Sequence, residues 1–171
     1  MAQYWPCFNA TQMSLVPRAR ERAEALVTDY YRIAPREWQR MRYEVKTLRL
    51  LDSSEVTDRA LAHTLCYSFR REAGPALLEE GDLYRICLQD HNILGAAQRA
   101  GLGLEPLLTY VLTHELVHVI RFGQRLQRLN LPLELRPQEE QRVEKTTQAI
   151  LRKSNDADLK TVLSSEIAHV H

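Results

Sequence analysis

The sequence predicts a mixed α+β fold built around one helix that is apolar on nearly every side. The segments 43–51 and 82–90 combine β-branched and apolar residues in partial alternation, a pattern typical of strands. Residues 106–122 carry apolar side chains at helical spacing around almost the whole circumference. Because such a helix is stable only when it is buried, we expect the strands and the other helices to pack around it.

The first half of the chain is expected to form a helix, a strand and a second helix. Pro17 suits the first turn of a helix over residues 17–31, and the apolar residues that follow it recur at helical spacing. The strand at 43–51 comes next. Two serines before Glu55 then offer an N-cap, and the amphipathic sequence of residues 56–72 predicts a helix.

The second half is expected to form a strand followed by helices. The strand at 82–90 leads into a region that three glycines mark as a loop around a short AAQRA segment: Gly95, Gly101 and Gly103. Pro106 suits the first turn of the central helix, 106–122. A further helix is expected over 137–153, opened by a proline and closed by two basic residues. The tail, 154–171, is expected to add one short helix.

Length and composition predict one domain over residues 1–171, with an N-terminal helical arm at 1–40 and a C-terminal tail at 154–171. Apolar residues make up 44% of the chain and charged residues 26%, which is ordinary for a globular protein. The formal net charge is +1, so no global field favours nucleic acid or a membrane surface. We therefore do not expect a nucleic-acid partner. The sequence leaves the oligomeric state open.

The compartment predicted from the sequence is the cytoplasm. The N-terminal residues lack the basic and then apolar regions of a signal peptide. No run of about 18 uncharged apolar residues exists, so no membrane-spanning helix is expected. The chain has three cysteines, Cys7, Cys66 and Cys87, an odd number without framework spacing that fits a reducing compartment.

The central helix contains the sequence THELVH, which places two histidines and a glutamate within an apolar run. His114 and His118 are four residues apart, so both rings project from one side of the helix and can hold one zinc ion (Zn²⁺). Glu115 is offset in angle, from where it can reach a metal-bound water, accept its proton and pass it to a leaving amine. This pattern predicts a zinc site and the hydrolysis of peptide bonds.

A third protein ligand is needed to leave one metal position open for water. The spacing of the metzincins is excluded, because Gln124 stands where their third histidine would be. A carboxylate on the helix at 137–153 is the next option, and Glu140 and Glu144 lie one turn apart there. Geometry alone does not separate the two. We prefer Glu144, because it is more embedded in the apolar stripe of that helix.

The sequence THELVH, followed after a loop by RVEKTTQAIL, resembles the gluzincin-type zinc metallopeptidases. The similarity is to the small cytoplasmic kind related to the phage immunity-repressor protease family, and it covers roughly residues 82–153. Glu144 with Ala149 and Leu151 matches the second helix of that family loosely. The resemblance implies a zincin-like fold, in which a small mixed sheet packs on the HExxH helix and on the following glutamate-bearing helix. It also implies a strand beside the active-site helix, here 82–90, that pairs with an extended peptide or protein substrate.

The chain departs from the gluzincin pattern at the residue that stabilises the oxyanion. No tyrosine follows Tyr110, and His169 and His171 are the only histidines after the motif. Arg121 could substitute, although a solvated or salt-bridged arginine is the simpler interpretation. Without such a donor the rate would be lower by a factor on the order of 10²–10³. The alternative function is therefore a zinc-stabilised protein-interaction module with weak or no catalysis.

Three other features remain open at this level. Cys87 lies in a predicted strand near the site and could ligate zinc, but we interpret it as a buried structural thiol. The C-terminal tail, with its two histidines, and the aromatic N-terminal arm could each fold over the cleft. Fraying of the tail is the simpler expectation.

Overall fold

The computed structural model describes residues 4–72, 78–126 and 130–169. The helices are α1 (Ala10–Tyr31), α2 (Pro35–Arg40), α3 (Asp90–Ala100), α4 (Leu104–Gly123), α5 (Arg136–Arg152) and α6 (Ala157–Ser164). The strands are β1 (Tyr43–Lys46), β2 (Ala62–Glu72) and β3 (Leu78–Leu88). Short 3₁₀ turns lie at η1 (Leu48–Leu50), η2 (Ser53–Glu55), η3 (Leu133–Leu135) and η4 (Glu166–His169). The fold is thus mixed α+β, as predicted.

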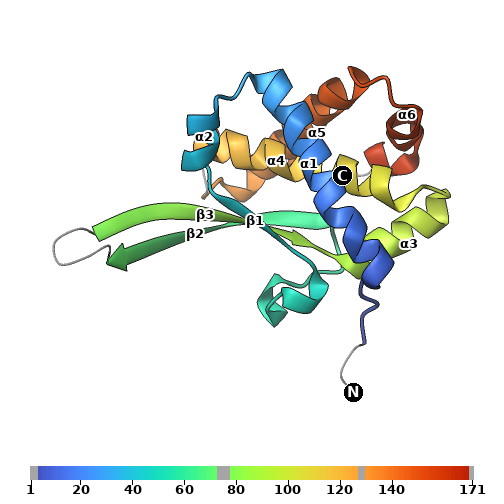
Figure 1. The fold of residues 1–171 in the computed structure, drawn as a ribbon, viewed down its shortest axis with the longest axis horizontal. Helices are drawn as coiled ribbons and strands as arrows, with labels where there is room; N and C mark the ends of the chain where they lie inside the picture. Colours follow the sequence, from blue (N-terminus) through green and yellow to red (C-terminus); the bar gives the residue numbers. More distant parts are fainter. Residues whose placement is uncertain (1–3, 73–77, 127–129, 170–171) are drawn as a thin grey trace.

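The three strands form one small mixed sheet in the order β1-β3-β2. β1 runs parallel to β3, with Val45 opposite Ile86, and β2 runs antiparallel to β3, with Thr64 opposite Ile86. Figure 1 shows that β2 and β3 extend as a long hairpin away from the helices, which gather above the opposite end of the sheet. Because β3 is central, β2 and β1 are the two edge strands.

Helix α4 is the centre of the packing, as the sequence predicts. All fourteen of its residues from Leu107 to Ile120 are buried. Helix α1 lies along it, and the alanines Ala19 and Ala23 on the buried side of α1 have no exposed surface. Small side chains one turn apart let two helix backbones approach closely. The predicted N-terminal arm therefore packs directly against the helix that carries the histidines.

Two predictions about local structure are wrong. Residues 56–72, expected as a helix, form an irregular segment followed by the strand β2, in which Thr64 and Cys66 alternate with Leu65 and Tyr67. Pairing along the whole of β3 satisfies the backbone hydrogen-bonding groups on one edge of β2. The threonine and aromatic residues of β2 also favour a strand. The region around Gly95, expected as a loop, is the helix α3.

The bounds of both predicted strands also differ from expectation. The first strand is shorter, because β1 ends at Lys46 and η1 follows. The second begins earlier, at Leu78, and ends at Leu88, so Asp90 opens α3 instead of closing a strand. The Asp90 carboxylate accepts hydrogen bonds from the backbone N–H groups of Phe8 at 2.9 Å and Leu48 at 3.0 Å. This buried carboxylate joins three parts of the chain at the start of α3.

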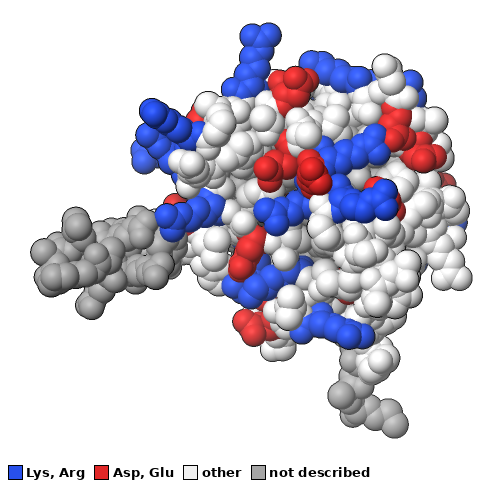
Figure 2. Space-filling view, viewed as in Figure 1, with Lys and Arg blue, Asp and Glu red and all other residues white. Residues whose placement is uncertain are grey.

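Surface charge and the apolar content of the helices bear on which partners the protein can bind. On the face drawn in Figure 2, lysine and arginine side chains are interspersed with aspartate and glutamate. Among the described helices, none has the length and apolar content needed to cross a bilayer.

Candidate metal centre

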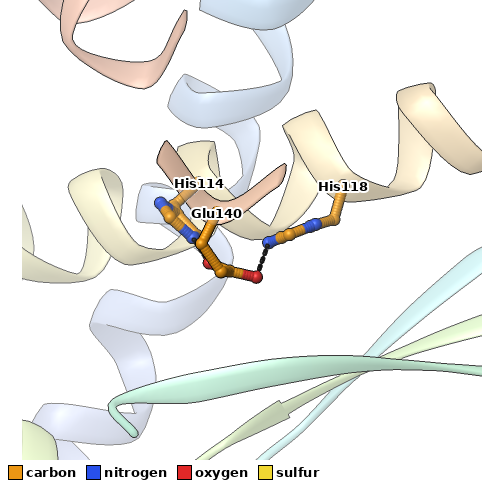
Figure 3. A group of neighbouring side chains, drawn as sticks. All are labelled: His114, His118 and Glu140. Carbon is orange, nitrogen blue, oxygen red and sulfur yellow. Dashed lines mark ion pairs between the residues drawn. The ribbon is translucent and has the colours of Figure 1, made fainter. Parts of the chain in front are cut away.

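Three side chains from two neighbouring helices converge on one point. His114 and His118 project from α4, and Glu140 projects from the first half of α5 toward both rings (Figure 3). The Nε2 atom of His114 lies 3.4 Å from one Glu140 carboxylate oxygen, and the Nε2 atom of His118 lies 3.2 Å from the other. One potential ligand atom from each residue can be chosen so that all three lie within 4.8 Å of one another. The group could therefore hold a metal ion.

The size of the group can be compared with the coordination sphere of a small ion. Nitrogen and oxygen ligands bind zinc at about 2.0–2.2 Å, which places neighbouring ligand atoms about 3.3–3.5 Å apart on the edges of the tetrahedron. The ligand atoms chosen one from each residue lie within 4.8 Å of one another, so modest side-chain adjustment would bring them to that edge length. The 3.4 and 3.2 Å separations run to the two different oxygens of the Glu140 carboxylate. Both histidines turn Nε2, one of the two ring nitrogens that can bind a metal, toward Glu140.

The histidine rings are held in place by their neighbours. The ring of His118 stacks on Phe122, one turn further along α4, with centroids 6.2 Å apart. Phe122 in turn stacks on Tyr84 of β3 at 6.0 Å and an interplanar angle of 8°. The sheet thus supports one of the two imidazoles through a column of rings.

Glu144, the residue preferred from the sequence as the third ligand, takes a different position. One of its carboxylate oxygens lies 3.3 Å from Nδ1 of His114, the ring nitrogen that faces away from Glu140. The structure therefore brings Glu140 to the metal point and sets Glu144 behind His114. A carboxylate on the second nitrogen of a ligand histidine fixes the ring orientation and raises its basicity.

Glu144 is itself held by two donors. The hydroxyl group of Tyr110 donates to one carboxylate oxygen at 2.8 Å, and the side-chain amide of Gln148 donates to the other at 2.8 Å. Tyr110 lies one turn before His114 on α4, and Gln148 lies one turn after Glu144 on α5. Burial and the negative charge of Glu144 raise the pKa of Tyr110, so its hydroxyl keeps the proton that it donates.

Glu115 is positioned by the sheet. The hydroxyl group of Thr64, on the edge strand β2, donates to a carboxylate oxygen of Glu115 at 2.8 Å. Glu115 is only 5% exposed. A buried carboxylate with a fixed donor is a suitable group to accept a proton beside a metal ion. The structure thus connects the middle residue of the motif to an edge strand.

The electrostatics of the group call for a positive charge at its centre. Burial lowers the pKa of His114, but hydrogen bonding to Glu140 and Glu144 outweighs burial and raises it to about 10. Burial raises the pKa of Glu140, but both histidines outweigh it and lower that pKa below its usual range. Three carboxylates, including Glu115, are thus gathered around two imidazoles. A proton on His114 or a bound cation would offset this charge.

Two further residues weighed from the sequence lie outside the group. The guanidinium of Arg121 forms an ion pair with buried Glu139, and the second contact of the pair measures 3.1 Å. This agrees with the interpretation of Arg121 as a salt-bridged arginine. Cys87 is completely buried, and burial raises the pKa of its thiol to about 12. It is not a member of the metal-binding group.

The described part of the C-terminal tail lies behind Glu144. The backbone carbonyl of Ala168, in η4, accepts a hydrogen bond of 3.1 Å from the same Gln148 amide nitrogen that donates to Glu144. The side chain of His169 and all of His171 lie outside what the structure describes. At the other end of the chain, the ring of Trp5 lies tilted against that of His91, with centroids 4.2 Å apart. His91 is on α3, which contributes no residue to the group.

Three supporting residues were missed by the sequence analysis. Tyr110 and Gln148 could have been found, because each is one helical turn from a predicted site residue and shares its face. Thr64 could not have been found in this way, because the segment 56–72 that contains it was predicted to be a helix.

Comparisons with known proteins returned no relatives. No family model matches the chain, and no curated protein and no solved structure is significantly similar to it.

Proposed function

We propose that this protein is a zinc-dependent metallopeptidase. The observation that carries the proposal is the convergence of His114, His118 and Glu140, whose ligand atoms lie within 4.8 Å of one another. The HExxH spacing on a buried helix supports it, as does the fixed carboxylate of Glu115 next to the two histidines. In this proposal Glu140, rather than Glu144, is the third ligand, and Glu144 orients His114.

The ligands, Glu115 and Thr64 have separate roles in the proposed hydrolysis. A zinc ion held by the three ligands would activate a water molecule and polarise the carbonyl group of the scissile bond. Glu115 accepts the proton of the attacking water and delivers it to the leaving amine. Thr64 holds the Glu115 carboxylate in one orientation for both transfers. Hydrolysis of an amide needs no further cofactor.

An extended peptide is the substrate class that the sheet suits best. The strand expected from the sequence to pair with substrate, now β3, is paired on both sides between Tyr84 and Cys87. The edge strand β2 contacts α4 through Thr64 and, among the described strands, pairs with β3 alone. A peptide that added to β2 would run beside Glu115. Free cysteines at all three positions support a cytoplasmic location for this activity.

A second function is favoured by one specific observation. Two side chains near the group could donate to an oxyanion, but both have other partners. Arg121 pairs with Glu139, and Tyr110 donates to Glu144. A zinc-stabilised module that binds a partner without cleaving it would have the same three ligands. The two functions differ in turnover and not in metal content.

The test uses purified full-length protein and Glu115→Gln, a substitution that keeps the shape of the side chain and removes its basicity. We expect both proteins to hold one equivalent of zinc and only the wild type to cleave a peptide library, measured by mass spectrometry of the products. Glu134→Gln, on the exposed turn η3, is the matched control and should cleave like wild type.

The outcomes separate the candidates. Zinc-loaded wild type without turnover would favour the interaction module. Equal turnover by wild type and Glu115→Gln would contradict the assigned role of Glu115. A protein that binds no stoichiometric zinc would exclude both functions.

A further inference from the structure

The contacts behind Glu144 form a chain from the metal ligands to the C-terminal end of the described structure. His114 contacts Glu144, Glu144 accepts from Gln148, and Gln148 also donates to the carbonyl of Ala168. Ala168 is completely buried in η4. The chain of contacts therefore joins α4, α5 and the tail.

The geometry of Gln148 suits this linking role. A side-chain amide has two N–H donors and one carbonyl acceptor. The amide nitrogen of Gln148 lies within hydrogen-bond distance of both Glu144 and Ala168, and its oxygen accepts from Arg152 at 3.1 Å. With all three groups engaged, rotation of the amide would break several contacts at once. Gln148 thus holds one oxygen of Glu144 in place relative to the tail.

Tyr110 holds the other oxygen of the same carboxylate. Its hydroxyl group donates to Oε2 of Glu144, the oxygen that also lies 3.3 Å from His114. The carboxylate is therefore fixed from α4 on one side and from α5 on the other. A carboxylate with a donor on each oxygen has one favoured orientation, and the ring of His114 follows it.

We propose that Tyr110 and Gln148 are positioning residues of the metal centre, and that Gln148 couples the C-terminal segment η4 to the orientation of His114. This inference rests on the proposed zinc site and goes beyond it, because neither residue is a ligand or a base. Its consequence is reciprocal: ordering of η4 favours metal binding, and metal binding orders η4.

The test measures zinc affinity of the full-length chain by competition with a chromophoric chelator. The variants are Gln148→Met, which removes the amide at similar volume, and Tyr110→Phe, which removes one hydroxyl group. Gln141→Met, at an exposed position of the same helix α5, is the control. We expect zinc dissociation constants about 3- to 10-fold higher for the first two variants, the change expected from one lost hydrogen bond, and no change for the control.

Two further readouts distinguish positioning from general destabilisation. The visible absorption bands of the cobalt(II)-substituted protein report ligand geometry, and we expect them to shift in Gln148→Met and Tyr110→Phe but not in Gln141→Met. Hydrogen exchange in peptides that cover residues 165–169 should slow when zinc binds to wild type. That slowing should be lost in Gln148→Met.

The possible results distinguish a failure of the positioning roles from a failure of the zinc site itself. Wild type that binds zinc, together with variants of unchanged or tighter affinity and unchanged cobalt spectra, would overturn the positioning roles. An equal loss of affinity in the control would overturn them too. If Gln148→Met does not fold, judged by circular dichroism, Tyr110→Phe tests the positioning role. The wild-type protein then tests the coupling, because hydrogen exchange at residues 165–169 that zinc leaves unchanged would overturn it. Wild type without zinc binding would overturn the zinc site, and this inference would fall with it.

Discussion

Two glutamates one turn apart on α5 take different positions in this structure, and the proposed function assigns them different tasks. Glu140 faces the Nε2 atoms of both histidines, whereas Glu144 faces Nδ1 of His114 and the hydroxyl group of Tyr110. Glu140 is half-exposed at its side chain, and Glu144 is buried. A ligand to a catalytic ion has to border the open position, while an orienting residue can be enclosed. The burial of each carboxylate fits its task.

The zinc affinities of variants at Glu140 and Glu144 test which residue is the ligand and which orients His114. Glu144→Gln should weaken zinc binding roughly 10- to 100-fold, the usual cost of losing a partner of a ligand histidine. Glu140→Gln removes a charged ligand and should weaken it by more. The measurement is competition with a chromophoric chelator, with Glu134→Gln as control. The reverse order would show that Glu144 is the ligand, as the sequence analysis preferred.

Thr64 offers a test of how the sheet supports Glu115. Thr64→Val keeps the branched shape suited to β2 and removes the hydroxyl group that donates to Glu115. We expect peptidase kcat to fall about 10-fold, because the carboxylate loses its fixed orientation, while the zinc dissociation constant stays unchanged. Steady-state kinetics and metal titration check this. A variant with wild-type kcat would show that Thr64 does not position the base.

The histidines and Glu115 could be identified from the sequence, but the choice between Glu140 and Glu144 could not. Residues i and i+4 share a helix face, so both glutamates point toward α4 from any correct placement of α5. Which one meets the metal point depends on how far α5 is shifted along α4. Tertiary packing sets that shift, and the periodicity of one helix does not predict it.

At the scale of elements, α4 and α5 were predicted well and the strand β2 was not. Helix α1 begins at Ala10, so Pro17 lies in its interior and not in its first turn as predicted. Helices α1, α4 and α5 each bury one or more regular stripes, which the sequence shows directly. β2 is an edge strand with one face toward α4 and the other toward η2, so its pattern depends on tertiary partners. Helix α3 was missed because Gly95 lies in its interior. There the side chain of Arg99 covers the glycine, and its nearest atom lies 3.0 Å from where a Cβ would be.

The turn η2 and the sheet are joined through a buried ion pair. Glu55, 1% exposed, accepts hydrogen bonds of 2.7 Å from the hydroxyl group of Tyr67 and 2.7 Å from the guanidinium of Arg85. The hydrogen bond from Tyr67 and the contact with Arg85 outweigh burial and lower the pKa of Glu55 to about 2. The carboxylate therefore stabilises the fold only while it is ionised.

The pH dependence of stability follows from the direction of that shift. A carboxylate whose pKa is lower in the folded chain contributes stability that is present above its unfolded pKa, about 4.5, and is lost as the pH falls toward 2. Glu55→Gln should lower the free energy of unfolding by about 2 kcal/mol at pH 7 and flatten its decline below pH 5. Urea titrations at several pH values check this, with exposed Asp58→Asn as control. An unchanged pH profile in Glu55→Gln would contradict the assigned contribution.

At the scale of the whole molecule, α4 connects every layer. It contacts α1 along its length, α5 at the metal point, and the sheet through Thr64 and Phe122. A metal ion that ties α4 to α5 would therefore stabilise the global fold, because the folded chain binds it and the unfolded chain lacks the assembled site.

Removal of the metal should thus lower the melting temperature. At a free zinc concentration of about 100 times the dissociation constant, binding adds about 2.7 kcal/mol. For a chain of this size that corresponds to a rise of roughly 5–10 °C. Differential scanning calorimetry with zinc and with a chelator measures the difference, and Glu140→Gln should show little of it. Equal melting temperatures in wild type would mean that no site on the folded chain selects zinc.

The central claim is that His114, His118 and Glu140 together hold one zinc ion. X-ray absorption at the zinc edge of the loaded, full-length protein tests it most directly. We predict one equivalent of zinc with nitrogen and oxygen neighbours at about 2.0–2.1 Å and the outer-shell pattern of two imidazoles, with one imidazole lost in His118→Ala. A sulfur neighbour at about 2.3 Å, or an unchanged spectrum in His118→Ala, would contradict the claim.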